Sequence, residues 1–128
     1  MPKILISEFI NHNSLNKLKR IFKVHYDEKL WKYPKKINRI IKNFDCLIVR
    51  NKTIVNKNLL NGANRIQLVG RLGVGMDNID TGYCYSKKIR IQPATGMNSY
   101  SVAEYVGASS LFLIKEGIVL NTAEKPLI

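Results

Sequence analysis

Short apolar runs alternate with helical patterns along most of the chain. A short, continuous apolar run bounded by turn residues is typical of a buried strand, whereas apolar residues recurring every three or four positions indicate an amphipathic helix. By these criteria the predicted strands cover residues 3–7, 23–26, 45–50, 66–69 and 89–91. The run at 45–50 is apolar throughout its centre, which is typical of a strand covered on both faces of a parallel sheet.

Helical spacing predicts a helix after each strand, and polar residues or proline mark where these helices begin. The residues able to begin them are, in chain order, Asn13 or Ser14, Pro34, Asn56, Asp80, and Asn98 or Ser99. Gly62 is placed to end the third helix. The last helix is the longest, and we expect it to bury Val102, Val106, Leu111 and Leu113.

This order of elements predicts a doubly wound α/β fold. We expect a mainly parallel, flavodoxin-like sheet with helices on both faces, ending in the long helix that begins at Asn98 or Ser99. Ligands bind such sheets beyond the carboxyl ends of the strands. Arg50, the turn at residues 73–75 and the loop before Asn98 each follow a strand, so we expect all three segments to gather at that edge.

The turn at residues 73–75 has the sequence Gly-Val-Gly. Two glycines remove two β-carbons, so the backbone can turn tightly and a ligand can approach the main-chain N–H groups. Successive N–H groups can form a concave anion site. The turn is therefore either a cradle for a carboxylate or phosphate, or a plain strand-to-loop connection. It is not a dinucleotide loop, because the third glycine of that fingerprint is replaced by Asn78.

Composition places the chain among single globular domains, but its charge is unusual. It has 128 residues, of which 45% are hydrophobic, and a formal net charge of +12. A strongly basic chain can bind nucleic acid, yet these lysines are spread along the chain and Lys, Asn and Ile are abundant together, as a biased genome composition would produce. We therefore expect no nucleic-acid partner, and keep a basic nucleic-acid-binding domain as a second alternative; part of the charge can steer small anions.

The cysteines, the tryptophan and the search for targeting signals give no positive evidence for a disulfide, a metal site or a membrane segment. Cys46 and Cys84 have neither CxxC spacing nor neighbouring histidines, so we expect no disulfide and no metal site. Trp31 stands among lysines, where it can stack on a base or, more commonly, cover the edge of the core. No signal peptide or membrane span is recognisable. We expect a cytoplasmic protein without a membrane partner.

Three motifs carry a resemblance to a known family. The runs at residues 47–53 (LIVRNKT), 69–80 (VGRLGVGMDNID) and 98–104 (NSYSVAE) resemble the NAD-dependent D-2-hydroxyacid dehydrogenases, most closely the D-3-phosphoglycerate dehydrogenase branch. They occur in the order and spacing of that family, and the similarity extends over residues 45–113. The segment before residue 45 fits only by its pattern of strands and helices.

The resemblance implies that residues 1–113 form a substrate-binding domain for a small anionic 2-hydroxy or 2-oxo acid. The backbone N–H groups of Val74 and Gly75 would hold the substrate carboxylate, and Arg50 would reach an anionic substituent such as a phosphate. Arg50 can equally be a solvated cation at a strand end. Asn98 matches an asparagine near the substrate, but it is equally placed to cap a helix. Asn51 stands where that branch usually has serine, which leaves the substrate open.

The resemblance also implies functions that these 128 residues do not contain. In the family, NAD binds a separate Rossmann domain, which supplies the catalytic arginine, carboxylate and histidine. None has a counterpart here, so we expect residues 114–128 to be a truncated linker, no catalytic residue in this chain, and no turnover by the chain alone. Whether the chain counts as an enzyme is left open.

Three further expectations concern partners. A separately encoded nucleotide-binding chain would make this a subunit of a split enzyme. A stand-alone or split-enzyme subunit that binds a small carboxylic acid is the first alternative. The long C-terminal helix, with more apolar surface than one sheet face can cover, predicts self-association.

Overall fold

The computed structural model describes residues 2–73, 75–94, 112–115 and 118–121. A five-stranded sheet with the order β2-β1-β3-β4-β5 forms the centre of the molecule, and all of its pairs are parallel. Its strands are β1 (Lys3–Ile6), β2 (Lys23–Tyr26), β3 (Cys46–Val49), β4 (Leu68–Leu72) and β5 (Arg90–Ala94). This is the strand order of flavodoxin-like sheets, so the predicted fold class is confirmed.

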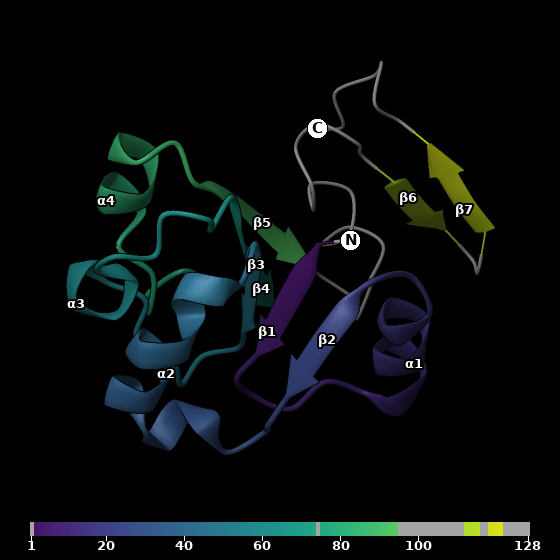
Figure 1. The fold of residues 1–128 in the computed structure, drawn as a ribbon, viewed down its shortest axis with the longest axis horizontal. Coiled ribbons are helices and arrows are strands. Elements are labelled where there is room, and N and C mark those ends of the chain that lie inside the picture. The colour runs from purple at the N-terminus through teal and green to yellow at the C-terminus, as the bar shows by residue number, and fades with distance from the viewer. Residues whose placement is uncertain (1, 74, 95–111, 116–117, 122–128) are drawn as a thin grey trace.

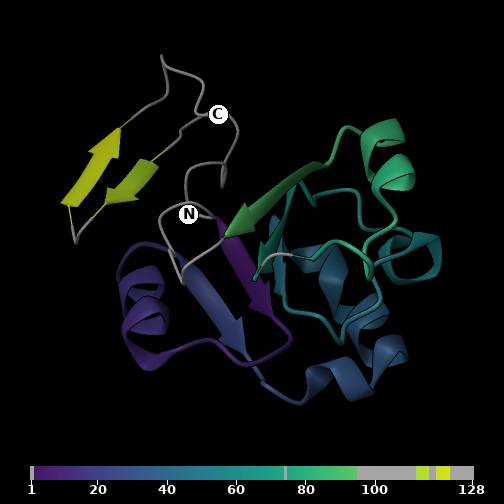
Figure 2. The same ribbon diagram turned by 180° about the vertical axis from the view of Figure 1, so that it is seen from behind.

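Helices cover both faces of this sheet. They are α1 (His12–Ile21), α2 (Pro34–Ile40), α3 (Lys57–Leu60) and α4 (Thr81–Ser86), with the short 3-10 helices η1 (Leu30–Lys32) and η2 (Ile41–Asn43) before and after α2. Helix α1 lies on one face of the sheet and α2, α3 and α4 lie on the other (Figure 1). The view from behind shows the same division (Figure 2).

Each central strand contributes to two hydrophobic cores, one on each face of the sheet. In β3, Cys46 and Ile48 pack on the side of α1, whereas Leu47 and Val49 pack on the side of α2, α3 and α4. All four side chains are fully buried. Successive side chains of a strand point to opposite faces, which explains why this run has no polar positions.

Two predicted element boundaries are wrong by a few residues. Helix α1 is capped by Asn11 and not by Asn13 or Ser14, because the Asn11 backbone is extended and its side chain accepts a hydrogen bond from the Ser14 N–H (2.8 Å). Strand β5 continues through Pro93 to Ala94, where we expected a loop. In the described sheet β5 is an edge strand paired only with β4, and an edge strand tolerates proline.

The predicted long helix is wrong at its C-terminal end. Leu113 belongs to strand β6 (Phe112–Lys115), which pairs antiparallel with β7 (Ile118–Asn121) in a separate two-stranded sheet. Two short apolar runs rich in β-branched residues, separated by two residues, favour a hairpin over a helix. Residues 95–111 lie outside the described residues, so the beginning of the predicted helix and its apolar patch stay predictions.

Candidate functional site

The loops after β3 and β4 meet at the carboxyl edge of the sheet. Val49 of β3 pairs with Arg71 of β4, so both chains leave the sheet at the same level. The side chain of Asn78 connects them: its Nδ2 donates to the carbonyl oxygens of Arg50 and Thr53, each at 2.7 Å, and its Oδ1 accepts from Nε of Arg71 at 3.3 Å. Asn78 is buried. The structure thus brings Arg50 and the glycine turn to one edge, two of the three segments that we expected there.

A buried carboxylate fixes the loop after β3. Glu8, which follows β1 and is only 3% exposed, accepts hydrogen bonds from the backbone N–H groups of Arg50 (2.8 Å), Lys52 (2.9 Å) and Thr53 (2.9 Å), and from the Thr53 hydroxyl (2.7 Å). A second hydroxyl, that of Ser7, shares a 2.7 Å hydrogen bond with Thr53. Sequence analysis missed Glu8, although an acid directly after a buried strand was a usable signal.

The Arg71 guanidinium lies against Gly73 and Gly75 of the glycine turn. The side chain is 8% exposed, and its Nη1 donates to the Leu72 carbonyl at 3.0 Å. A β-carbon on Gly73 would lie 2.7 Å from Nη1, and one on Gly75 would lie 3.0 Å from Nη2. Gly73 also has a φ of +108°, which disfavours other residues. The glycines therefore make room for a guanidinium, a residue role that sequence analysis missed.

This arrangement places a positive charge beside half-buried main chain. Gly73 and Gly75 are both half-buried, so the turn keeps contact with solvent. A guanidinium favours oxyanions because it presents several N–H donors in a fixed plane. Gly75 thus lies where the carboxylate cradle was predicted, while Val74 and Asn98 lie outside the described residues. The proposed roles of Arg50, Asn51, Val74, Gly75 and Asn98 stay predictions.

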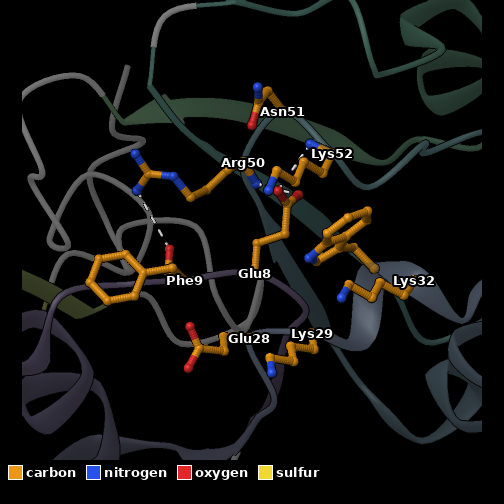
Figure 3. A pocket seen from close by; sticks show the side chains of 9 residues that line it. Glu8, Phe9, Glu28, Lys29, Lys32, Arg50, Asn51 and Lys52 are labelled. Atoms are coloured by element: carbon orange, nitrogen blue, oxygen red, sulfur yellow. Dashed lines mark hydrogen bonds between the residues drawn. The ribbon is translucent and has the colours of Figure 1, made fainter.

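A pocket of about 310 Å³ opens beside the Arg50 loop (Figure 3). Its lining has four cations, Lys29, Lys32, Arg50 and Lys52. It also has the two acids Glu8 and Glu28 and the uncharged side chains of Phe9, Trp31 and Asn51. Arg50 and Phe9 lie at one side of the view in Figure 3 and Lys32 at the other. The predicted residues Arg50 and Asn51 therefore belong to a basic pocket.

Two of the lysines in this pocket lie over the ring of Trp31. Nζ of Lys52 lies 4.7 Å from the centroid of its ring and Nζ of Lys32 lies 5.6 Å from it. Both distances are within the range of cation–π attraction. Trp31 itself is half-buried in η1.

The cysteines take no part in this edge. Cys46 and Cys84 are free, buried, and belong to the cores on opposite faces of the sheet. Burial raises the pKa of the Cys84 thiol to about 11, with a smaller contribution from the charge of Asp80, and raises the pKa of Cys46 further. Among the described residues no group of His, Cys, Asp and Glu could hold a metal ion. In the same part of the chain, every helix is too short or too polar to cross a membrane.

Solved structures share this fold. A crystal structure of a protein from Pyrococcus horikoshii OT3 superposes with a TM-score of 0.70 at 26% identity, over 82% of this chain and 31% of that one. The NAD+-bound 3-phosphoglycerate dehydrogenase of Entamoeba histolytica gives a TM-score of 0.58 at 22% identity, over 72% of this chain and 32% of that one. The second likeness shows the fold alone.

Sequence relatives extend the similarity to the N-terminal segment. The chain is 39% identical over 122 residues to the (S)-sulfolactate dehydrogenase of Chromohalobacter salexigens, covering 95% of this chain and 39% of that protein. It is 33% identical over 104 residues to the D-3-phosphoglycerate dehydrogenase of Methanocaldococcus jannaschii, covering 81% of this chain and 20% of that one. The chain thus spans well under half the length of these relatives.

A family model described as "D-isomer specific 2-hydroxyacid dehydrogenase, catalytic domain" matches residues 4–124. This match includes the segment before residue 45, where the motifs alone gave no resemblance. It also includes the Arg50 loop, the glycine turn and all of the five-stranded sheet except Lys3, the first residue of β1. The chain therefore belongs to the D-isomer specific 2-hydroxyacid dehydrogenase family.

Proposed function

We propose that this chain is the substrate-binding part of an NAD-dependent dehydrogenase that acts on a 2-hydroxy acid. The family acts on 2-hydroxy acids, and the proposal assigns the acid to the carboxyl edge of β3 and β4. One observation carries it: the buried Arg71 guanidinium lies against Gly73 and Gly75, and Asn78 joins it to the Arg50 loop.

In this proposal the glycine turn holds the substrate carboxylate. The N–H groups of residues 74 and 75 donate to the carboxylate oxygens, and the adjacent guanidinium stabilises their negative charge. Asn98, at the third predicted segment, contacts the same acid. The turn remains half-buried at Gly75, so a small solute can reach it.

The described residues do not fit NAD. The described residues between the glycine turn and α4, 75–80, contain no helix, whereas a dinucleotide loop opens directly into a helix. Family members are NAD-dependent. We propose that the nucleotide and the groups that move the proton lie on a Rossmann domain outside residues 1–128, in the same or a separate polypeptide, with residues 1–113 as the substrate domain.

The unpaired thiols suit a reducing compartment. Both cysteines are buried and free, and disulfides are rare in the cytosol because thiols are kept reduced there. We accordingly propose a cytoplasmic location.

Titration of the 128-residue chain with D-glycerate tests the binding proposal. D-glycerate is a 2-hydroxy acid with one carboxylate, and amide chemical shifts around Gly75 report its binding. Gly75→Ala places a β-carbon 3.0 Å from Nη2 of Arg71 and displaces the guanidinium, so we expect about a tenfold loss of affinity, the effect of one charged hydrogen bond.

Gly82→Ala is the matched control. Its β-carbon would meet only Oδ1 of Asp80 at 3.7 Å, an ordinary contact in helix α4, so we expect unchanged affinity. Equal affinity in the Gly75 and Gly82 variants, or no binding of D-glycerate at millimolar concentration, contradicts the proposed function.

A further inference from the structure

The outer face of α2 is positively charged along its whole length. The exposed charged residues of α2 and of η2, which follows it directly, are Lys35, Lys36, Arg39 and Lys42. Their spacing places them on one side of the helix, which we call the basic face. The opposite side is buried, because Ile37 and Ile41 are fully buried in the core. We expected no nucleic-acid partner because the lysines are spread along the chain, but folding gathers these four cations in one row.

The fold gives the basic face no acid to balance it. Among the described residues none of its four cations forms an ion pair, and Asp45, the next acid in the chain, is paired with Arg65. Lys35 and Arg39 are four residues apart in the helix and repel each other. Lys35 and Lys36 also lie in the first turn, where the helix dipole favours acids. Charges that weaken their own helix in this way are expected where a surface has a binding function.

The basic face is too long for one small anion. At a rise of about 1.5 Å per residue, the row from Lys35 to Lys42 is about 10 Å long. A single phosphate group contacts one or two of these cations, whereas a chain of phosphates contacts the whole row. The arrangement therefore fits a polyanion.

A nucleic acid fits this face better than a lipid surface does. A helix that lies on a membrane inserts its apolar side below the headgroups. In α2 that side is already occupied, since Ile37 and Ile41 pack in the core of the domain. A nucleic acid requires no insertion, because lysine and arginine bind its phosphates at the protein surface.

A groove and an exposed aromatic ring adjoin the basic face. The groove has a volume of about 450 Å³ and lies between α2 and residues 54–59, where Ile54 and Asn58 line it. Lys35 belongs to both the groove and the basic face. Tyr33, directly before α2, is 58% exposed, as is Ile54. Aromatic side chains beside a row of cations are the platforms on which the bases of single strands stack.

We propose that the basic face of α2, together with Tyr33 and the adjoining groove, binds single-stranded nucleic acid. The four cations contact successive phosphates, and Tyr33 stacks on a base. Stacking and phosphate contacts tolerate any sequence, so the partner is an RNA or DNA strand without a fixed sequence. The basic face and Tyr33 belong to neither the Arg50 loop nor the glycine turn, so this binding is independent of the proposed function.

Fluorescence anisotropy of a labelled oligouridylate of about twelve nucleotides, a length typical of single-strand sites, tests the proposal. If each cation neutralises one phosphate, the logarithm of the association constant should fall with the logarithm of salt concentration at a slope of about −3. The double substitution Lys36→Gln and Arg39→Gln should weaken binding and change the slope to about −1.5. An oligodeoxythymidylate of equal length shows whether RNA or DNA binds more tightly, and preference for either strand supports the proposal.

The double substitution Lys19→Gln and Arg20→Gln is the matched control. It removes one lysine and one arginine from exposed positions of α1, on the other face of the sheet (Figure 1). We expect it to retain the slope of about −3. Equal changes in the two double variants would show attraction by the net charge of the whole chain and would overturn the proposal.

Tyr33→Ser tests the same surface without altering a charge. Serine is compatible with the position before a helix, and loss of one stacked base should weaken oligouridylate binding about tenfold. Tyr85→Ser, at a 68% exposed position of α4, should leave binding unchanged. Circular dichroism checks the fold of each variant. Equal binding by the two tyrosine variants, or tighter binding of an RNA duplex or of phosphatidylserine vesicles than of the single strand, overturns the proposal.

Discussion

Two buried polar residues, Glu8 and Asn78, fix the loops of the site. Each is less than a tenth exposed, and each bonds to several main-chain groups of the Arg50 loop, of which the N–H and carbonyl of Thr53 are bonded at buried positions. An unsatisfied buried donor or acceptor costs about 1–3 kcal/mol. Replacing either residue should therefore cost more than removing an exposed charge.

Glu8→Gln should lower the free energy of unfolding by about 2 kcal/mol. The carboxylate accepts at both oxygens, whereas an amide presents an NH₂ group to one of the donors now bonded to Glu8. Urea denaturation followed by circular dichroism measures the change.

Glu28→Gln is the control for that variant. Glu28 is an exposed acid on the same pocket, and its replacement should change the free energy of unfolding by less than about 0.5 kcal/mol. Similar losses in the two variants would show that the Glu8 hydrogen bonds contribute nothing beyond the charge.

Gly73→Ala should destabilise the protein by about 1–3 kcal/mol. The residue has a φ of +108°, and the added methyl group would lie 2.7 Å from Nη1 of Arg71. Thermal unfolding measures the effect. A Gly73 variant as stable as the wild type would contradict the packing of Arg71 in the turn.

Gly82→Ala is the control. It should stabilise the protein by about 0.5–1 kcal/mol, because alanine favours the helical backbone of α4.

At the scale of elements, the sequence pattern located strands better than it located their ends. The central strands are recognisable because both of their faces are buried, so the apolar run itself marks β3. The start of α1 was harder to place, because Asn11, Asn13 and Ser14 can all cap a helix. The extended backbone of Asn11 and its hydrogen bond from the Ser14 N–H distinguish it, and neither can be read from the sequence.

Helix α3 depends on a contact with another helix. It has four residues, Lys57–Leu60, too few for a stable helix alone. The Asn38 side chain of α2 lies within hydrogen-bond distance of three carbonyl oxygens at its C-terminal end, those of Asn58, Leu59 and Asn61. These carbonyls have no partner within the helix, so Asn38 acts as its cap.

Asn38→Ala should destabilise the protein by about 1–2 kcal/mol and increase amide hydrogen exchange in α3. Asn43→Ala, at an exposed position of η2, should leave both quantities unchanged. Exchange measured by NMR tests this prediction. Unaltered protection of α3 in the Asn38 variant would argue that the helix is held by its buried leucines alone.

At the scale of the whole molecule, the sequence predicted where the site lies but not what holds it. Position after a strand was enough to select Arg50 and the glycine turn. Glu8 and Asn78 act through hydrogen bonds to residues far away in the chain, with separations of 45 and 25 residues for their bonds to Thr53. Arg71 lies inside a recognised motif. However, the pattern of apolar and polar positions cannot show that the side chain of a strand residue packs against the turn that follows its strand.

The buried thiols give the stability of the whole domain a dependence on alkaline pH. The pKa of Cys84 is raised from 9.0 to about 11 on folding, so between these values the unfolded chain has lost a proton that the folded protein retains. Fewer protons on the unfolded state mean that the free energy of unfolding falls as pH rises. We expect a decline from pH 9 to pH 11.

Cys84→Ala should make that decline shallower, as measured by urea denaturation at pH 8, 9, 10 and 11. The comparison with wild type removes contributions from lysine and tyrosine, which titrate in both proteins. Identical slopes would show that Cys84 ionises equally in the folded and unfolded chain.

The single amide of Asn78 has a consequence for selectivity. It joins the Arg50 loop to Arg71 through hydrogen bonds that are buried or partly buried, so the span between the glycine turn and the Arg50 loop is held rigid. With the substrate carboxylate at the turn, as proposed above, this rigid span fixes how far the Arg50 loop lies from that carboxylate. An acid that reached Arg50 from the turn would therefore have to match a spacing that the protein sets in advance.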